Sequence, residues 1–325
     1  MYSYGRIDVH QHIVPPGYAA WLAEQGITAG GMPLPKWTQQ DAIGQMDELG
    51  IATGVVSVST PGVHLGDDRM ARAKAREVNE YAAEQVKDRP DRFGFFATLT
   101  LPDVAGALAE AAYALDELAA DGVILLANVR GAYLGDPAFD PLMDELDRRS
   151  AVVFVHPSHL PGPGVEGIPA FLADFLLDTT RAAINLVRHG AMDRWPNLRI
   201  ILSHGGGFVP YAAHRFAYTR LEGSPSPADF LAALGRFHFD TALSSSPAAL
   251  PSLLSFAQPG HVMFGSDWPY APVRSVRHFE GEWTGYDGVS EPVRAAVDRR
   301  NAERLFPRLS SKDASDLEIR QDMAV

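Results

Sequence analysis

Histidine and aspartate residues stand at the ends of several apolar runs of the sequence, where they could bind a metal ion. His10 and His12 close the first run, and the alternation of side chains along a strand places both on the same side. A third histidine, His156 or His204, ends a later run, and Asp267 ends another. Imidazole and carboxylate ligands of this kind make a site for a divalent cation that needs no sulfur.

The alternative is that these side chains are merely buried and hydrogen-bonded. A lone histidine such as His204 is more often a core residue than a ligand. However, burying several ionisable groups at strand ends without a shared counter-charge costs several kcal/mol in total. A cation at their centre is the simplest way to offset this cost, so the pattern favours the metal site.

Eight short apolar or β-branched runs must position these residues. They cover residues 6–12, 52–58, 93–99, 123–129, 152–156, 199–204, 237–242 and 262–267. Most are apolar at nearly every position, which is typical of strands buried on both faces of a parallel sheet. Segments with helical periodicity lie between them. The pattern predicts an α/β fold, a (β/α)8 TIM barrel, in which the working residues come from the C-terminal ends of the strands.

The length and the composition agree with one large domain. The chain has 325 residues and no cysteine, which excludes disulfides, zinc fingers, iron–sulfur ligation and thiol catalysis. No Gly/Pro/Ser-rich stretch resembles a domain linker. We predict a single barrel domain over residues 1–308 and a polar C-terminal tail over residues 309–325.

The charge balance argues against several classes of partner. The chain carries 28 Lys and Arg against 40 Asp and Glu, a net charge of −12, and shows no basic stripe for nucleic acid. No apolar stretch is long enough for a signal peptide or a membrane span. We therefore expect no nucleic acid or membrane partner, and a cytoplasmic location.

Four motifs together resemble those of the amidohydrolase superfamily. They are Asp8-Val-His10-Gln-His12, Val155-His156-Pro157, Ser203-His204-Gly-Gly-Gly207 and Gly265-Ser-Asp267-Trp-Pro269. The chain looks most like the mononuclear branch that contains aminocarboxymuconate-semialdehyde decarboxylase and the hydroxybenzoate decarboxylases. The resemblance runs over nearly the whole chain, from about residue 6 to residue 306.

The resemblance implies a role for each matching residue. His10, His12, His156 and Asp267 would ligate one divalent metal per subunit, Zn²⁺ or alternatively Mn²⁺. His204 would act as an acid or base beside the bound water or substrate, and Asp267 would protonate the ring carbon. Arg215 would reach the substrate carboxylate, commonly that of the neighbouring subunit. A homodimer or a dimer of dimers follows from this last role.

The sequence also departs from the superfamily at two places. No Lys ends the run 123–129, although the dinuclear hydrolases have one there, so a two-metal hydrolase is disfavoured. The semialdehyde decarboxylase has an Arg just before a Trp ahead of its second strand, whereas this chain has Lys36 before Trp37. A dicarboxylate substrate is therefore doubtful. The glycines after His204 are expected to let the backbone pass close to a bound substrate.

The resemblance makes a metal-dependent, non-oxidative decarboxylase of a small aromatic hydroxy acid the first hypothesis. The loop 59–67 looks most like the 6-methylsalicylate-type enzymes. In this loop His64 either contacts the substrate or caps the loop, and His159 lies close enough to His156 to line the same pocket. The alternatives are a mononuclear hydrolase such as a lactonase, which would use the same ligands, and a non-catalytic binding protein.

Overall fold

Eight parallel strands form the centre of the molecule. The computed structural model describes residues 5–219 and 225–310. The strands are β1 (Arg6–His12), β2 (Ile51–Ser57), β3 (Phe93–Thr98), β4 (Gly122–Leu126), β7 (Val152–His156), β8 (Arg199–Leu202), β9 (His238–Asp240) and β10 (Val262–Met263). Neighbours in this order pair with one another. The ring closes where the Val9 amide on β1 donates to the Phe264 carbonyl, at 3.0 Å. The predicted (β/α)8 barrel is confirmed.

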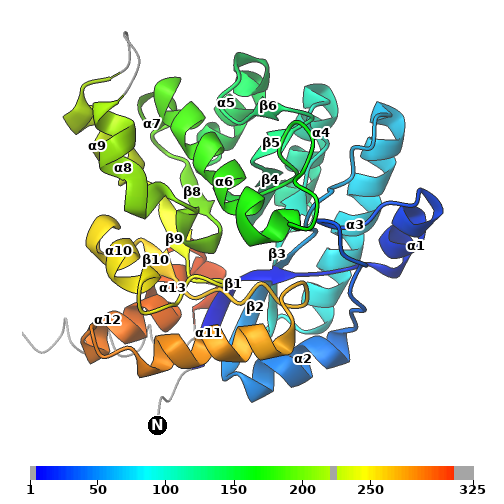
Figure 1. The fold of residues 1–325 in the computed structure, drawn as a ribbon. Coiled ribbons are helices and arrows are strands. Elements are labelled where there is room, and N and C mark those ends of the chain that lie inside the picture. Colours follow the sequence, from blue (N-terminus) through cyan, green and yellow to red (C-terminus); the bar gives the residue numbers. More distant parts are fainter. Residues whose placement is uncertain (1–4, 220–224, 311–325) are drawn as a thin grey trace, which may run out of the picture.

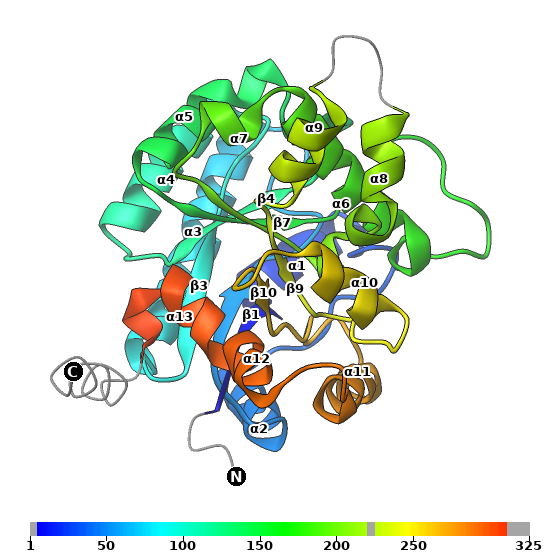
Figure 2. The same ribbon diagram turned by 90° about the vertical axis from the view of Figure 1, so that its left-hand side faces the viewer.

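Helices surround the strands on the outside (Figures 1 and 2). They are α1 (Pro16–Glu24), α2 (Gln39–Glu48), α3 (Asp68–Asp88), α4 (Val104–Asp116), α5 (Asp140–Arg148), α6 (Ala170–Arg188), α7 (Ala191–Arg194), α8 (Val209–Tyr218), α9 (Pro227–Leu234), α10 (Ala249–Phe256), α11 (Val273–Gly285), α12 (Glu291–Ala295) and α13 (Asn301–Leu305). Polar side chains begin several of them. Asp67 caps α3 and Asp103 caps α4, each by accepting a backbone N–H of the first turn. Among the described residues, no helix is both long and apolar enough to cross a membrane.

Two of the predicted strands end three or more residues earlier than expected. The run 123–129 is a strand only as far as Leu126. Its last two residues, β5 (Asn128–Val129), pair antiparallel with β6 (Ala132–Tyr133) in a small hairpin. The run 262–267 is a strand only over β10, and its last residue, Asp267, has a φ of 64°. An apolar run shows burial but does not reveal where the backbone leaves the sheet.

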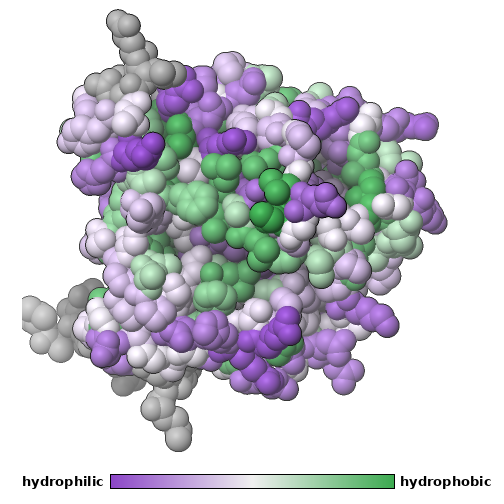
Figure 3. Space-filling view, viewed as in Figure 1, coloured by the Kyte–Doolittle hydropathy of each residue, from purple (hydrophilic) through white to green (hydrophobic). Residues whose placement is uncertain are grey.

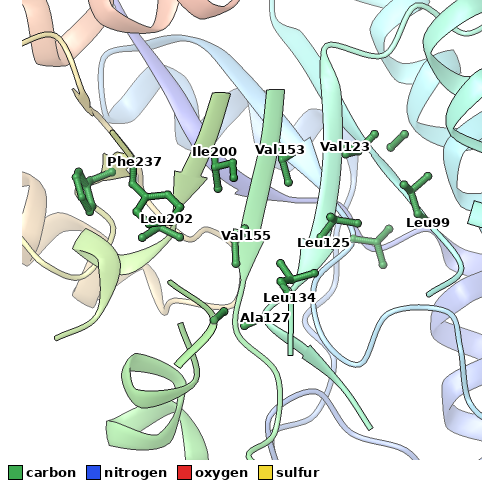
Figure 4. Close-up of a cluster of buried hydrophobic side chains, with 14 of the residues drawn as sticks. Leu99, Val123, Leu125, Ala127, Leu134, Val153, Val155, Ile200, Leu202 and Phe237 are labelled. Carbon is green, nitrogen blue, oxygen red and sulfur yellow. The ribbon is translucent and has the colours of Figure 1, made fainter. Parts of the chain in front are cut away.

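The core has two layers, one inside the barrel and one between the barrel and the helices. On β7, Val153 and Val155 face the helices, whereas Phe154 lies in the interior cluster against Phe96 of β3. Figure 4 shows side chains of the outer layer from β4, β7 and β8. Both faces of each strand are thus covered, which is why the runs are continuously apolar. Most of the tail predicted at residues 309–325 lies outside the described residues.

A buried histidine at the start of β9 makes stability depend on pH. Burial and the stacked ring of His261, 4.0 Å away between centroids, lower the pKa of His238 to about 3. Below pH 6.5 the unfolded chain binds a proton here that the folded protein does not, so stability falls as the pH drops. Between pH 6.5 and 5 the free energy of unfolding should fall by about 2 kcal/mol for this reason.

Urea denaturation at pH 7 and at pH 5 measures this effect. In the variant His238→Phe, which keeps a stacked ring, the difference between the two pH values should shrink by that amount. His278→Phe, which changes an exposed histidine, should behave like the unaltered protein. An equal pH dependence in all three proteins would show that His238 binds its proton as readily in the folded state as in the unfolded chain.

Candidate active site

The predicted ligands meet at the carboxyl ends of the parallel strands. His10 and His12 lie at the end of β1, and His156 is the last residue of β7. Asp267 follows β10 in a loop that runs beside β1, where its amide donates to the His10 carbonyl at 2.7 Å. The pairing of β1 with β2 shifts its register between Asp8 and Gln11, at the point where the two histidines begin to face the barrel axis.

The four side chains converge on one buried point. The Nε2 atoms of His10 and His12 lie 3.1 Å apart, and Asp267 Oδ1 lies 3.3 Å and 3.0 Å from them, respectively. With one atom of His156, these atoms all lie within 4.8 Å of one another. All four residues are buried. Among the described residues this is the one group of this kind, so a single metal site is indicated rather than a pair.

The outer nitrogen of each imidazole is held by an acceptor. Nδ1 of His10 lies 2.7 Å from Asp240 Oδ2, Nδ1 of His12 lies 3.2 Å from the Ser57 carbonyl oxygen, and Nδ1 of His156 lies 2.9 Å from the Pro157 carbonyl oxygen. A carboxylate or a carbonyl can only accept a hydrogen bond, so each neutral ring carries its proton on Nδ1. Its Nε2 lone pair then faces the common centre.

This arrangement fits a metal ion. Three Nε2 lone pairs and a carboxylate oxygen are all acceptors, and acceptors buried this close together repel one another unless a cation lies between them. An acceptor behind each ligating imidazole is also the usual companion of a protein metal site. Nitrogen and oxygen donors without sulfur suit zinc or manganese.

The pKa shifts in the cluster also favour a bound cation. Burial alone would lower the pKa of His10, yet the carboxylates of Asp240 and Asp267 raise it to about 10. Burial opposes ionisation of Asp267, but the adjacent imidazoles of His10, His12 and His204 hold its pKa well below the usual range. Burial lowers the pKa of His12 and of His156. Without a cation, a proton on His10 offsets the neighbouring carboxylates, and this proton and a metal ion compete for the same place.

Asp240 links the cluster to His204, and it is a residue that the sequence analysis missed. Its Oδ2 accepts from His10, and its Oδ1 accepts from the backbone N–H of His204 at 2.9 Å. His204 Nε2 in turn lies 3.5 Å from Asp267 Oδ2, while its buried Nδ1 has no hydrogen-bond partner within residues 5–219 and 225–310. The one available signal for Asp240 was a carboxylate inside the apolar run 237–242.

The backbone is strained at two of these residues. His204 has φ 54° and Asp267 has φ 64°, both in the left-handed region that side chains other than glycine rarely adopt. Each such residue costs about 1–3 kcal/mol and persists only where the surroundings impose it. Here the strain points both side chains at the same centre.

A mainly apolar cavity of about 460 Å³ opens above the cluster. His156, His204 and Asp267 form part of its wall. The apolar part of the wall comes from four regions of the chain. It consists of Ala29, Met32, Phe171, Leu172, Phe175, Leu176, Leu243, Ala271, Pro272 and Phe279. Several exposed apolar residues lie at the start of α6 and before it, and Figure 3 shows hydrophobic residues gathered in this region of the surface. The cavity suits a small ring with a polar end.

Tyr270 is a second residue that the sequence analysis missed. It lines the cavity, its ring packs edge-on against His12 at 5.2 Å, and its buried hydroxyl has no hydrogen-bond partner among the described residues. Burial raises the pKa of this phenol, so it stays a neutral donor. Its position only three residues after Asp267, in the loop after the last strand, was the available signal.

Other residues proposed from the sequence lie elsewhere. Arg215 is exposed on α8 and does not line the cavity of its own chain. His64 hydrogen-bonds to Asp68 at 2.8 Å and borders a separate cavity of about 30 Å³. His159 and Lys36 are exposed and do not line the large cavity either.

Two of the three glycines after His204 allow close packing of the backbone. A Cβ on Gly206 would lie 2.7 Å from the ring of Phe239, and one on Gly207 would collide with the Leu176 carbonyl. Both glycines have positive φ. They therefore allow the turn after β8 to lie tightly against β9 and α6.

The comparison with known families decides the ancestry of the chain. The family model described as Amidohydrolase matches residues 7–308. The chain belongs to the amidohydrolase family. This span includes all four residues of the cluster. It also includes every strand of the barrel, except for the first residue of β1. The suspected superfamily is confirmed.

Within the amidohydrolase family the chain is similar to proteins named as decarboxylases. It is 40% identical over 318 residues to the 6-methylsalicylic acid decarboxylase of Penicillium expansum, covering 94% of this chain and 97% of the relative. It is 38% identical over 322 residues to decarboxylase yanB of Aspergillus niger, covering 93% and 88%. A solved structure of 2,6-dihydroxybenzoate decarboxylase with 2,6-dihydroxybenzoate superposes with a TM-score of 0.80 at 25% identity, covering 94% and 99%.

Proposed function

We propose that this amidohydrolase-family protein is a metal-dependent, non-oxidative decarboxylase of a small aromatic hydroxy acid, of which 6-methylsalicylate is the first candidate. The observation that carries the proposal is the buried acceptor cluster at the base of an apolar cavity of about 460 Å³. The names of the two relatives described above support the choice of reaction and of substrate.

The reaction replaces a carboxylate on a ring carbon with a proton. The bond between the ring and the carboxylate breaks, CO₂ leaves, and the electron pair left on the ring carbon forms a bond to a proton. A divalent cation held by His10, His12, His156 and Asp267 would supply Lewis acidity toward the substrate's oxygen atoms. One proton is consumed in each turnover.

The proton reaches the ring carbon through Asp267, with His204 as its partner. Asp267 Oδ2 and His204 Nε2 are 3.5 Å apart, and both residues line the cavity. A proton that enters at His204 can therefore pass to Asp267 and then to the carbon. Asp240 holds the backbone of His204 in place for this transfer.

The remaining wall residues bind and orient the ring. Phe175, Leu176 and Phe279 exclude water from it, which strengthens every polar interaction inside the cavity. The free hydroxyl of Tyr270 donates to an oxygen of the substrate. Ser59 and Thr60 provide further polar atoms of the cavity wall, in the loop after β2.

We propose Zn²⁺ as the resident ion, with Mn²⁺ as the alternative, because imidazole and carboxylate accommodate both. Elemental analysis of the purified protein distinguishes them. We also propose a homodimer or a dimer of dimers, in which the exposed Arg215 of α8 approaches the cavity of the neighbouring subunit.

A direct assay of the products tests the proposed reaction. We expect the metal-loaded protein to release CO₂ from 6-methylsalicylate and to form 3-methylphenol in equal amount. A panel of other hydroxybenzoates then ranks the substrates by kcat/KM. Lactones are assayed in parallel by ring opening. Hydrolysis of a lactone without CO₂ release from any hydroxybenzoate would support a mononuclear hydrolase and contradict the proposal.

A further inference from the structure

We propose that Arg274 recognises the carboxylate of the substrate from within the same subunit, at the wall of the cavity. The inference rests on the proposed function and adds to it a residue that selects anions. Arg274 is the one Lys or Arg among the described residues that line the large cavity. Without it, the charged side chains of the wall at neutral pH would be those of Asp267 and of any protonated histidine.

The geometry of α11 turns Arg274 toward the cavity. The helix begins at Val273, directly after the loop that carries Asp267 and Tyr270, and Arg274 is its second residue. In an α-helix each Cα–Cβ bond leans toward the N-terminus. The side chain of Arg274 therefore leans back over the loop that holds Asp267, and not along the outer surface of the barrel.

The charge of Arg274 has no structural explanation among the described residues. A cation in the first turn of a helix opposes the helix dipole, and α11 has no acidic residue there to compensate. Arg274 forms no ion pair with any described carboxylate. Arg277, one turn further along, does form one, with its Nη2 2.5 Å from Glu48 Oε2. A guanidinium that is exposed, unpaired and placed against the dipole is disfavoured locally, which is typical of a residue kept for binding.

A carboxylate anion is the ligand that fits this residue. The wall is otherwise mostly apolar, so an aromatic acid can place its ring against Phe279 and Phe175 while its charge meets the guanidinium. A guanidinium binds a carboxylate through two parallel hydrogen bonds. The same positive charge at the entrance also offsets the repulsion between an incoming anion and a chain whose net charge is −12.

The test compares the acid with its decarboxylated product as ligands of the metal-loaded protein. Calorimetry in the metal-loaded Asp267→Asn background, which does not turn the acid over, measures the Kd of 6-methylsalicylate and of 3-methylphenol. The two compounds share the ring, the methyl and the hydroxyl but differ by the carboxylate. In Arg274→Ala we expect the Kd of the acid to rise about tenfold and that of the phenol to change less than about twofold. KM should follow the Kd of the acid, whereas kcat stays within about twofold of its original value.

Two further variants separate recognition from a structural effect. Arg277→Ala removes a neighbouring guanidinium of the same helix and should change neither Kd. Arg274→Lys keeps the charge but loses the bidentate fork, and it should restore part of the affinity for the acid. Added salt should weaken binding of the acid to the unaltered protein more than to Arg274→Ala.

The outcomes also distinguish this inference from the proposed function. Binding of the acid that depends on Arg274, without CO₂ release, would support the inference and contradict the decarboxylase. Equal affinity of Arg274→Ala and the unaltered protein for the acid would overturn the inference. If Arg215→Ala instead lowered the affinity for the acid about tenfold, the carboxylate would be held by the neighbouring subunit alone.

Discussion

Replacing Asp267 with Asn is expected to lower kcat for CO₂ release at least about a thousandfold. The amide keeps the size of the side chain but cannot carry the proton to the ring carbon, and it removes the negative charge beside His10 and His12. Single-turnover measurements of CO₂ release, made together with a determination of the metal content, check the result. A variant that retains its metal and is inactive would assign the loss to proton transfer.

A matched variant controls for the loss of any buried carboxylate. Asp103 is also buried, but it caps α4 and pairs with Arg72, whose Nε lies 2.6 Å from its Oδ2. Asp103→Asn should lower the stability and leave kcat per folded molecule unchanged. An Asp267→Asn protein with more than about a tenth of the original kcat would remove Asp267 from the mechanism.

Removal of the metal is expected to abolish activity and to lower the stability of the fold. Dialysis against a chelator should leave a protein whose CO₂ release falls with its metal content, and added Zn²⁺ or Mn²⁺ should restore it. The acceptors of the cluster repel one another without the ion, so the metal stabilises the native state. At a free metal concentration about a hundred times Kd, the gain is about 2.7 kcal/mol.

Histidine variants test whether the stabilisation by metal arises at the proposed site. In His12→Gln, added metal should shift the unfolding midpoint much less than in the unaltered protein, because one of the four ligands is lost. His189→Gln changes an exposed histidine at the end of α6 and should leave the metal response intact. Full activity in protein with far less than one metal per chain would contradict a metal-dependent reaction. Metal affinity should also fall at acid pH, since protons compete for the imidazoles.

The sequence predicted the barrel and the cluster because each depends on properties that a single strand carries. A strand buried on both faces must be apolar at nearly every position, and 152–156 is such a run. A residue at its C-terminal end, such as His156, must then face the mouth of the barrel. The residue types that bind a metal are few, so the motifs around His10, His12 and Asp267 indicate a metal site by themselves.

The structure alone decided which side chains share a cavity. Asp240 and Tyr270 had no motif of their own, and Arg274 looked like any arginine of a surface helix. Their roles follow from where distant segments of the chain meet and from backbone angles such as φ 64° at Asp267, which local sequence does not specify. For the same reason His64 lies beside Asp68 and outside the large cavity.

The sequence by itself thus indicated the fold class and a metal site without cysteine, because residue types and their spacing are local properties, and the resemblance to the amidohydrolase superfamily selected His10, His12, His156 and Asp267 as its ligands. The tertiary structure decided that the Nε2 lone pairs face one point, that the wall above them is apolar, and that Arg274 stands at this wall while Arg215 does not. These are relations between segments far apart in the chain, and packing and long-range hydrogen bonds set them.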